Sequence, residues 1–237
     1  MEDDIIVFKE IKFHNYNFDK LFSLINEGGY LVAPAASALS NINKDYKYHK
    51  SLINSDVAIL DSGFFCILLR IFKRKKVSKF SGYLFLKSFL NLKFNEETKF
   101  LCIDPNFEES KANSSYLKYK NIVNNKSYVA PKYDNKEIID NNLLEEINKF
   151  QPKYIIINLG GGIQERLAHY IKNNCSYKVS ILCTGAAISF LTKKQAPIND
   201  MIDKFYLGWF VRTLYNPKKF LFRTIKSLSL INLFIKD

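Results

Sequence analysis

The sequence predicts an α/β protein with a largely parallel, Rossmann-like sheet, helices on both faces of the sheet and a helical C-terminal appendage. Short apolar runs alternate with longer segments in which apolar residues recur at helical spacing, and this alternation is typical of a doubly wound parallel sheet. Beyond Gly185 the short runs stop and only helical periodicity remains. The chain has 237 residues, of which 47% are hydrophobic, so it can fill a substantial core.

Seven apolar runs are predicted to be strands, at residues 5–8, 30–34, 57–61, 99–104, 127–131, 153–160 and 178–185. Helices are predicted at 17–26, which stops at Gly28, and at 135–150, which ends before Pro152. Two consecutive helices are expected at 203–215 and 218–235, with Pro217 at the start of the second. We therefore divide the chain into an α/β core, residues 1–200, and a basic helical appendage, residues 201–237.

The net charge, the N-terminal residues and the cysteines limit the classes of protein to which the chain can belong. A formal charge of +12 indicates an anionic partner, which can be a phosphate-rich small molecule, a nucleic acid or an acidic membrane surface. The N-terminus is acidic and no apolar run reaches about 18 residues, so we expect a protein that is neither secreted nor membrane-spanning. No C-x-x-C pair is present, so neither a zinc site nor a disulfide framework is expected of the four cysteines, Cys66, Cys102, Cys175 and Cys183.

A glycine-rich turn is the most specific local feature. The segment INLGGGIQERLAHY, from Ile157, runs from a strand through Gly160, Gly161 and Gly162 directly into a helix. Such a turn lets backbone N–H groups approach a phosphate at the positive end of the helix dipole. It is neither the G-x-G-x-x-G fingerprint nor a P-loop. By itself it fits a tight packing turn as well as a ligand-binding loop.

Four linked motifs follow one another in the last third of the chain: NLGGGIQE from Asn158, TGAAISF from Thr184, the pair Ala196 and Pro197, and LGWFVRTLYNPKKFLFR from Leu207. Together they resemble the motifs of the WecG/TagA/CpsF glycosyltransferases, glycosyltransferase family 26. Their order and spacing match over roughly the last third of the chain, and a weaker match reaches back to Tyr30. The resemblance implies a nucleotide-sugar-dependent glycosyltransferase. The sequence contains no D-x-D metal-binding signature, which agrees with a metal-independent mechanism.

The resemblance also assigns roles to single residues. It aligns Asp61 with the general base that deprotonates the acceptor hydroxyl, although an aspartate there also fits a cap of the next helix. Gln164 and Glu165 are implied to hold the nucleotide, because a Gln amide can pair with a uracil edge. Glu165 fits equally well a first-turn acid favoured by the helix dipole. The resemblance places the glycine turn and Gly185 in the same donor site.

Basic residues are implied to meet the phosphates and the membrane. Lys79 matches a basic family position and is implied to neutralise the donor pyrophosphate; alternatively it is one of many solvated charges in a segment without acidic residues between Asp61 and Glu96. The last helix is expected either to lie on an anionic bilayer or to pack on the core. Four cations of the appendage are implied to contact the diphosphate and the membrane-facing side of the site: Arg212, Lys218, Lys219 and Arg223.

The resemblance implies transfer of a hexose or N-acetylhexosamine-type sugar from a UDP-sugar to a polyprenyl-diphosphate-linked saccharide, in bacterial capsule or other surface-polysaccharide synthesis. We expect a cytoplasmic protein, peripheral on the inner face of the membrane, with no metal and no nucleic-acid partner. Some motif positions depart from the family: Ala35, Gly162, Ser189 and Gly208 replace asparagine, proline, aspartate and glutamate. These departures leave open a catalytically inactive homologue that binds another transferase, and the charge leaves open a nucleic-acid-binding domain.

Overall fold

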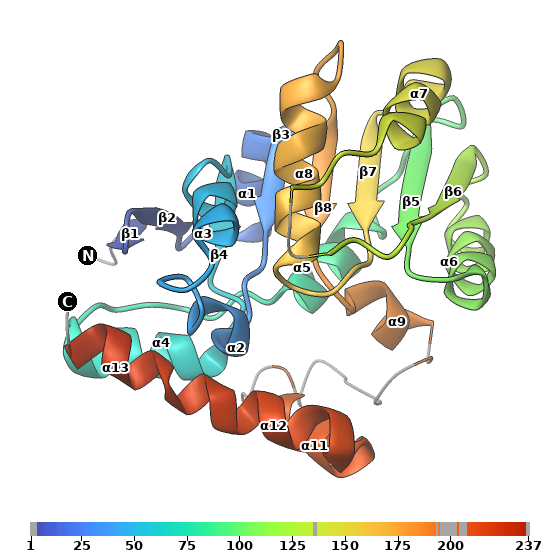
Figure 1. Ribbon diagram of the computed structural model, residues 1–237. Helices are drawn as coiled ribbons and strands as arrows, with labels where there is room; N and C mark the ends of the chain where they lie inside the picture. The colour runs from blue at the N-terminus through green and yellow to red at the C-terminus, as the bar shows by residue number, and fades with distance from the viewer. Residues whose placement is uncertain (1–3, 135–136, 193, 195–202, 204–207, 236–237) are drawn as a thin grey trace.

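The computed structural model describes residues 4–134, 137–192, 194, 203 and 208–235. Its centre is an eight-stranded sheet in the order β1-β2-β4-β3-β8-β7-β5-β6 (Figure 1). Within the described ranges β1 alone runs antiparallel, and every other strand pair is parallel. This confirms the predicted α/β class. The strands are β1 Ile5–Phe8, β2 Ile11–His14, β3 Gly29–Val32, β4 Val57–Ile59, β5 Phe100–Asp104, β6 Asn125–Val129, β7 Tyr154–Ile157 and β8 Ser180–Cys183.

Helices cover both faces of the sheet and create two apolar cores (Figure 1). The first core is completed by α2 Ala36–Leu39, α3 Tyr46–Ile53, α4 Gly63–Phe72, α7 Asn141–Phe150, α8 Ile163–Asn174 and α13 Leu230–Ile235. The second core is completed by α1 Phe18–Ile25, α5 Gly82–Phe89, α6 Phe107–Tyr119 and α9 Ala187–Leu191. The sheet is therefore a middle layer between two helical layers, as the alternation of the sequence predicts.

The central strands are buried on both sides, and alternate residues feed alternate cores. In β7, Ile155 and Ile157 belong to the first core while Tyr154 and Ile156 belong to the second. All four side chains are almost fully buried. This explains why the strands appear in the sequence as continuous apolar runs without polar alternation. The same alternation determines which face of the sheet the side chain of each residue just beyond a strand lies on.

The structure differs from the sequence-based elements in three places. Strand β2 was not predicted. The helix predicted at 135–150 begins only at Asn141, where the Asp140 carboxylate accepts a hydrogen bond from the N–H of Leu143 and so caps the helix, while Ile138 is buried outside it. The predicted helix 218–235 is two helices, α12 Pro217–Leu228 and α13, and Pro217 begins α12 as expected.

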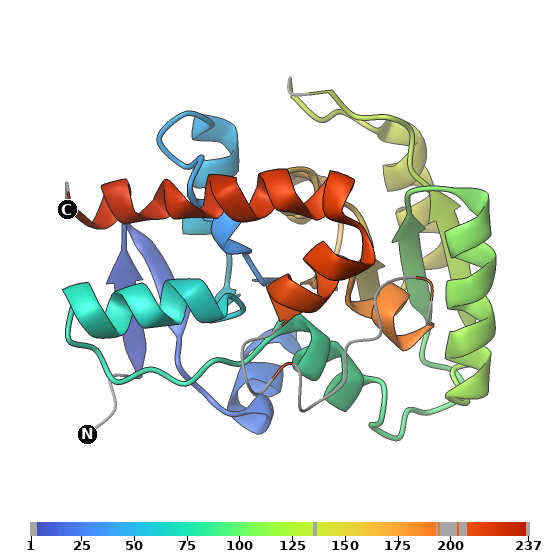
Figure 2. The same cartoon turned by 90° about the horizontal axis from the view of Figure 1, so that it is seen from below.

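The C-terminal helices lie beyond the carboxyl ends of the parallel strands (Figures 1 and 2). There α12 packs against α2, and α13 packs against α4. Leu230, Leu233 and Phe234 of α13 are buried, and the Phe234 ring stacks on Phe8, so α13 is packed on the core. The division at residue 200 stays a prediction. Among the described residues, no helix has the length and hydropathy needed to cross a bilayer.

Candidate active site

The parallel strands β3, β4, β5, β7 and β8 all end at the same edge of the sheet (Figure 1). Of the predicted site residues, Asp61, Gly160 and Gly185 follow the ends of β4, β7 and β8 within three residues. In open α/β sheets ligands bind in the crevice outside the carboxyl ends of the strands. The helix α12 also reaches this edge through its packing against α2. We call this side of the molecule the carboxyl edge.

The glycine turn between β7 and α8 is an open loop. A Cβ atom added at Gly160 or Gly162 would meet no atom within 4 Å. Gly162 has φ +93°, a conformation that a glycine adopts without strain. The Arg166 guanidinium braces the turn, because its Nε donates to the Gly162 carbonyl at 2.8 Å. The N–H groups of Gly160 and Gly161 have no partner among the described residues, so two backbone donors remain for a ligand.

Gln164 and Glu165 form hydrogen bonds that stabilise this turn. Glu165 is fully buried, and its carboxylate accepts hydrogen bonds from the N–H of Gly162 at 2.6 Å and from the Gln164 amide at 3.0 Å. Burial raises the pKa of Glu165, and these hydrogen bonds oppose the rise. The side-chain oxygen Oε1 of Gln164 in turn accepts the N–H of Gly185 at 2.9 Å. The pair therefore ties two glycine turns together, and in this arrangement both side chains face the protein.

Asp61 follows β4 and bonds to the start of α5. Its Oδ1 accepts the N–H of Gly82 at 2.9 Å, and the side chain is half-buried. The alternative that Asp61 caps the next helix is wrong, because Ser62 caps α4 by accepting the N–H of Phe65. A side chain at Gly82 would lie only 3.2 Å from the carbonyl oxygen of Thr184. Asp61 is therefore connected to the end of β8 through Gly82, which bonds to Asp61 and packs against Thr184.

Lys79 contacts the C-terminal part of the chain. Its ammonium lies 2.5 Å from a carboxylate oxygen of Asp203, and both side chains are 10% exposed. The other carboxylate oxygen of Asp203 accepts the Ser81 hydroxyl at 2.8 Å. The Lys79 charge is therefore balanced by a protein carboxylate in this structure, and its predicted role at a pyrophosphate stays a prediction. Asp203 was not predicted, because nothing in its local sequence distinguishes it from an exposed helical acid.

The predicted cations of the appendage are only partly described. Lys218 and Arg223 are exposed on α12, which packs on α2. A side chain at Gly161 would lie 3.6 Å from Ala38 of α2, so α2 adjoins both α12 and the glycine turn. The side chains of Arg212 and Lys219 lie outside the described residues, as do Ala196 and Pro197.

Three polar side chains at the carboxyl edge were missed. Asp104 ends β5, and Asn158 and Thr184 directly follow β7 and β8. One oxygen of each is buried and has no hydrogen-bond partner among the described residues: Oδ2 of Asp104, Oδ1 of Asn158 and Oγ1 of Thr184. An unsatisfied buried polar atom costs about 1–3 kcal/mol, so three together are unusual. We call these residues the oxygen row. Each follows a buried apolar run, and that position is the signal that could have found them.

The oxygen row is anchored on one side. Asp104 Oδ1 accepts the Asn113 and Asn158 amides, each at 2.7 Å. Burial raises the pKa of Asp104, and the two amide hydrogen bonds oppose the rise. Next to the row, the Ser189 hydroxyl of α9 donates to the Glu109 carboxylate of α6 at 3.1 Å. By the motif resemblance, Ser189 occupies a position where the family has an aspartate. In this chain the nearby carboxylate is that of Glu109, which comes from α6.

The four cysteines are free, and Cys66, Cys102 and Cys183 are buried. Burial raises the pKa of all three buried thiols, which therefore favour the neutral form. In the described part of the chain, no three His, Cys, Asp or Glu side chains gather in a way that could hold a metal ion. The polar groups of the carboxyl edge can thus offer backbone donors, one half-buried carboxylate and a set of oxygen acceptors.

The fold defines an α/β protein with a mostly parallel sheet, and its candidate ligand site lies outside the carboxyl ends of the strands. A family model described as the glycosyl transferase WecG/TagA/CpsF family matches residues 6–237. The match covers nearly the whole chain, and the chain therefore belongs to this glycosyltransferase family. No individual curated protein matches the chain in a sequence comparison.

Proposed function

We propose that the protein transfers a hexose or N-acetylhexosamine-type sugar from a UDP-sugar to a polyprenyl-diphosphate-linked saccharide, without a metal, in the synthesis of a bacterial surface polysaccharide. The observation that carries the proposal is the open glycine turn. In a member of a glycosyltransferase family, Gly160 and Gly161 present two unpaired N–H groups at the same edge as Asp61. Backbone N–H groups at a helix N-terminus suit a diphosphate, and the carboxylate suits an acceptor hydroxyl.

The reaction follows from these groups. Asp61 takes the proton of the acceptor hydroxyl, and the acceptor oxygen forms a bond to the anomeric carbon of the donor sugar. The bond from that carbon to the phosphate oxygen breaks, and UDP leaves with the electron pair. The glycine amides stabilise the charge that develops on the diphosphate, together with cations of α12 such as Lys218 and Arg223.

Exposed apolar side chains on α12 support an acceptor held at a membrane. Leu221, Phe222, Ile225 and Leu228 are all more than half exposed, on a helix that also carries Lys218 and Arg223. A helix with exposed apolar groups and cations suits the surface of an anionic bilayer. We therefore place the protein on the inner face of the cytoplasmic membrane.

Asp61→Asn tests the reaction. An asparagine oxygen can still accept the N–H of Gly82, so we expect the free energy of unfolding to change by less than about 1 kcal/mol. The turnover number for sugar transfer should fall about 10²- to 10⁴-fold, because the base is lost. The assay follows UDP release with a UDP-sugar and a lipid-linked acceptor. Asp56→Asn, at the opposite edge of the sheet, is the matched control and should keep full activity.

The inactive homologue is the second candidate, and two positions favour it. Ala35 precedes α2 and provides no side-chain cap where the family has an asparagine, and Ser189 replaces an aspartate. If the wild-type chain binds neither UDP nor any UDP-sugar in calorimetry, this candidate replaces the enzyme. If the chain binds a UDP-sugar and Asp61→Asn transfers it at the wild-type rate, the donor site stands and Asp61 is not the base.

A further inference from the structure

The oxygen row is aligned across three neighbouring strands. In the sheet register Ile103 lies opposite Ile157, and Ile156 lies opposite Leu182. One residue beyond the first pair, Asp104 therefore lies beside Asn158. Two residues beyond the second pair, Asn158 lies beside Thr184. Because the residues before them, Ile103, Ile157 and Cys183, all face the first core, the row faces the second. Three oxygens thus stand side by side on one face, at the carboxyl edge.

The row is enclosed by three helices, α5, α6 and α9. Gly82 of α5 approaches the backbone of Thr184, Asn113 of α6 donates to Asp104, and α9 begins three residues after Thr184. Asp104, Asn158 and Thr184 are 0%, 5% and 7% exposed. The hydrogen bonds from Asn113 and Asn158 use Oδ1 of Asp104; the Ser110 hydroxyl of α6 is also near the carboxylate, but Oδ2 makes no hydrogen bond of good geometry among the described residues. The anchored carboxyl group therefore has one oxygen left for a ligand.

The chemistry of the row selects a ligand with adjacent donors. The Asn158 carbonyl oxygen is an acceptor only, a carboxylate oxygen is an acceptor, and the Thr184 hydroxyl can accept or donate. A phosphate presents acceptors alone to these groups, and a uracil edge presents a single N–H donor between two carbonyl oxygens. Two neighbouring hydroxyl groups present two donors at adjacent positions. Within a UDP-sugar, such pairs occur on the ribose and on the transferred sugar.

We infer that the oxygen row binds vicinal hydroxyl groups of the donor, through Asp104 and Asn158 as acceptors and Thr184 as the third contact. This inference rests on the proposed function and assigns the polyol part of the donor to a subsite separate from the glycine turn, which takes the phosphates. The Glu109 carboxylate accepts the Ser189 hydroxyl, is only partly buried and acts electrostatically on Asp104, so a second carboxylate lies near the row.

The test is a calorimetric titration of the full chain with UDP, 2′-deoxy-UDP and UDP-N-acetylglucosamine. Thr184→Val keeps the shape of the side chain and removes the hydroxyl, whereas Thr184→Ser keeps the hydroxyl and is the matched control. We expect Thr184→Val to weaken binding about 3- to 10-fold and Thr184→Ser to bind within about twofold of wild type. Asp104→Asn replaces the open acceptor by a donor, and we expect a loss of about 10-fold or more.

The ligands separate the two sources of the hydroxyl pair. If the row binds the ribose, 2′-deoxy-UDP binds wild type more weakly than UDP does, and Asp104→Asn causes little further loss with the deoxy ligand. If the row binds the transferred sugar, the variants weaken UDP-N-acetylglucosamine and leave UDP unchanged. Unchanged affinities for every ligand in both Thr184→Val and Asp104→Asn overturn the inference alone. A wild-type chain that binds no uridine nucleotide overturns the proposed function, and the inference falls with it.

Discussion

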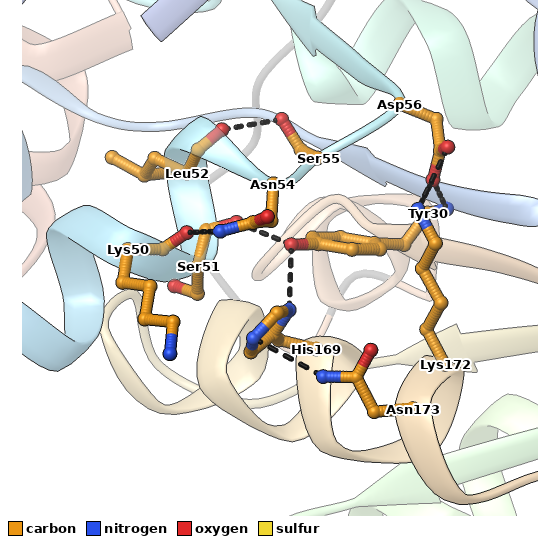
Figure 3. Close-up of polar contacts among 10 residues, drawn as sticks. All are labelled: Tyr30, Lys50, Ser51, Leu52, Asn54, Ser55, Asp56, His169, Lys172 and Asn173. Carbon is orange, nitrogen blue, oxygen red and sulfur yellow. Dashed lines mark hydrogen bonds and ion pairs between the residues drawn. The ribbon is translucent and has the colours of Figure 1, made fainter. Parts of the chain in front are cut away.

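The two edges of the sheet differ in whether their polar groups have hydrogen-bond partners. At the amino edge, where β3 and β4 begin, Asp56 accepts the N–H of Tyr30 at 2.8 Å and pairs with Lys172 at 2.8 Å (Figure 3). The Tyr30 hydroxyl donates to the Ser51 carbonyl and lies 3.3 Å from His169 Nδ1. These polar groups are satisfied by one another. At the carboxyl edge the oxygen row and two glycine amides have no partner among the described residues.

The glycines show the same contrast. At the amino edge Gly29 has φ +103°, and a side chain there would collide with the Asp56 carboxylate. At the carboxyl edge Gly160 faces open space. The same residue type therefore serves close packing at one edge and an open surface at the other. The amino edge therefore stabilises the fold, and the open surface at the carboxyl edge is what the proposed donor site requires.

The largest expected difference in stability comes from matched glycine substitutions. Gly29→Ala forces an alanine into a left-handed conformation and against Asp56, so we expect the free energy of unfolding to fall by about 2–4 kcal/mol. Gly160→Ala should change it by less than about 1 kcal/mol, because its side chain meets nothing. Urea denaturation of both variants measures the two values. Equal losses would remove the contrast between the edges.

A smaller effect, which depends on pH, tests the burial of Asp104. Burial raises its folded-state pKa, so the folded protein binds more protons than the unfolded chain above the ordinary aspartate value of about 4. The contribution of Asp104 to the free energy of unfolding of the wild type therefore falls as the pH rises from about 4 to the raised folded-state pKa, and it is constant above that pKa. The stability of Asp104→Asn relative to wild type should increase over the same interval, by about 1.4 kcal/mol for each unit of the shift.

Urea denaturation of both proteins at several pH values measures this difference. A difference that stays constant from about pH 4 upward would show that Asp104 is not perturbed and that the oxygen row is exposed to water in solution.

Most of the sheet could be predicted because its central strands are buried on both sides and appear as continuous apolar runs. Seven apolar runs led to seven strands, and the glycine turn was placed correctly between β7 and α8. Strand β2 was missed because its turn from β1 uses Lys9 and Glu10 at φ 47° and 64°, where sequence rules expect glycine or asparagine. The helix near residue 135 was predicted too early, since Ile138 continues the helical periodicity without belonging to a helix.

Residues that are neighbours in sequence could be predicted to lie together, whereas contacts that the sheet assembles could not. Gln164 and Glu165 follow the glycine turn in sequence, but their hydrogen bonds to Gly185 and Gly162 form only with both turns in place, and their role at a nucleotide stays a prediction. Asp104 and Asn158 are 54 residues apart in sequence and meet only through the register of β5 and β7. Lys79 and Asp203 likewise meet across the fold. A single sequence carries no signal for such pairs.

The most direct test of the central claim is to fill the open turn. Gly160→Val places a branched side chain at a position where a Cβ atom would meet no protein atom within 4 Å, so we expect the fold to be kept while the ligand is excluded. Calorimetric titration with UDP and UDP-N-acetylglucosamine should show saturable binding to wild type and to the amino-edge control Asp56→Asn, and a loss of about 10-fold or more in Gly160→Val. Wild-type affinity in a folded Gly160→Val protein would contradict a donor site at the carboxyl edge.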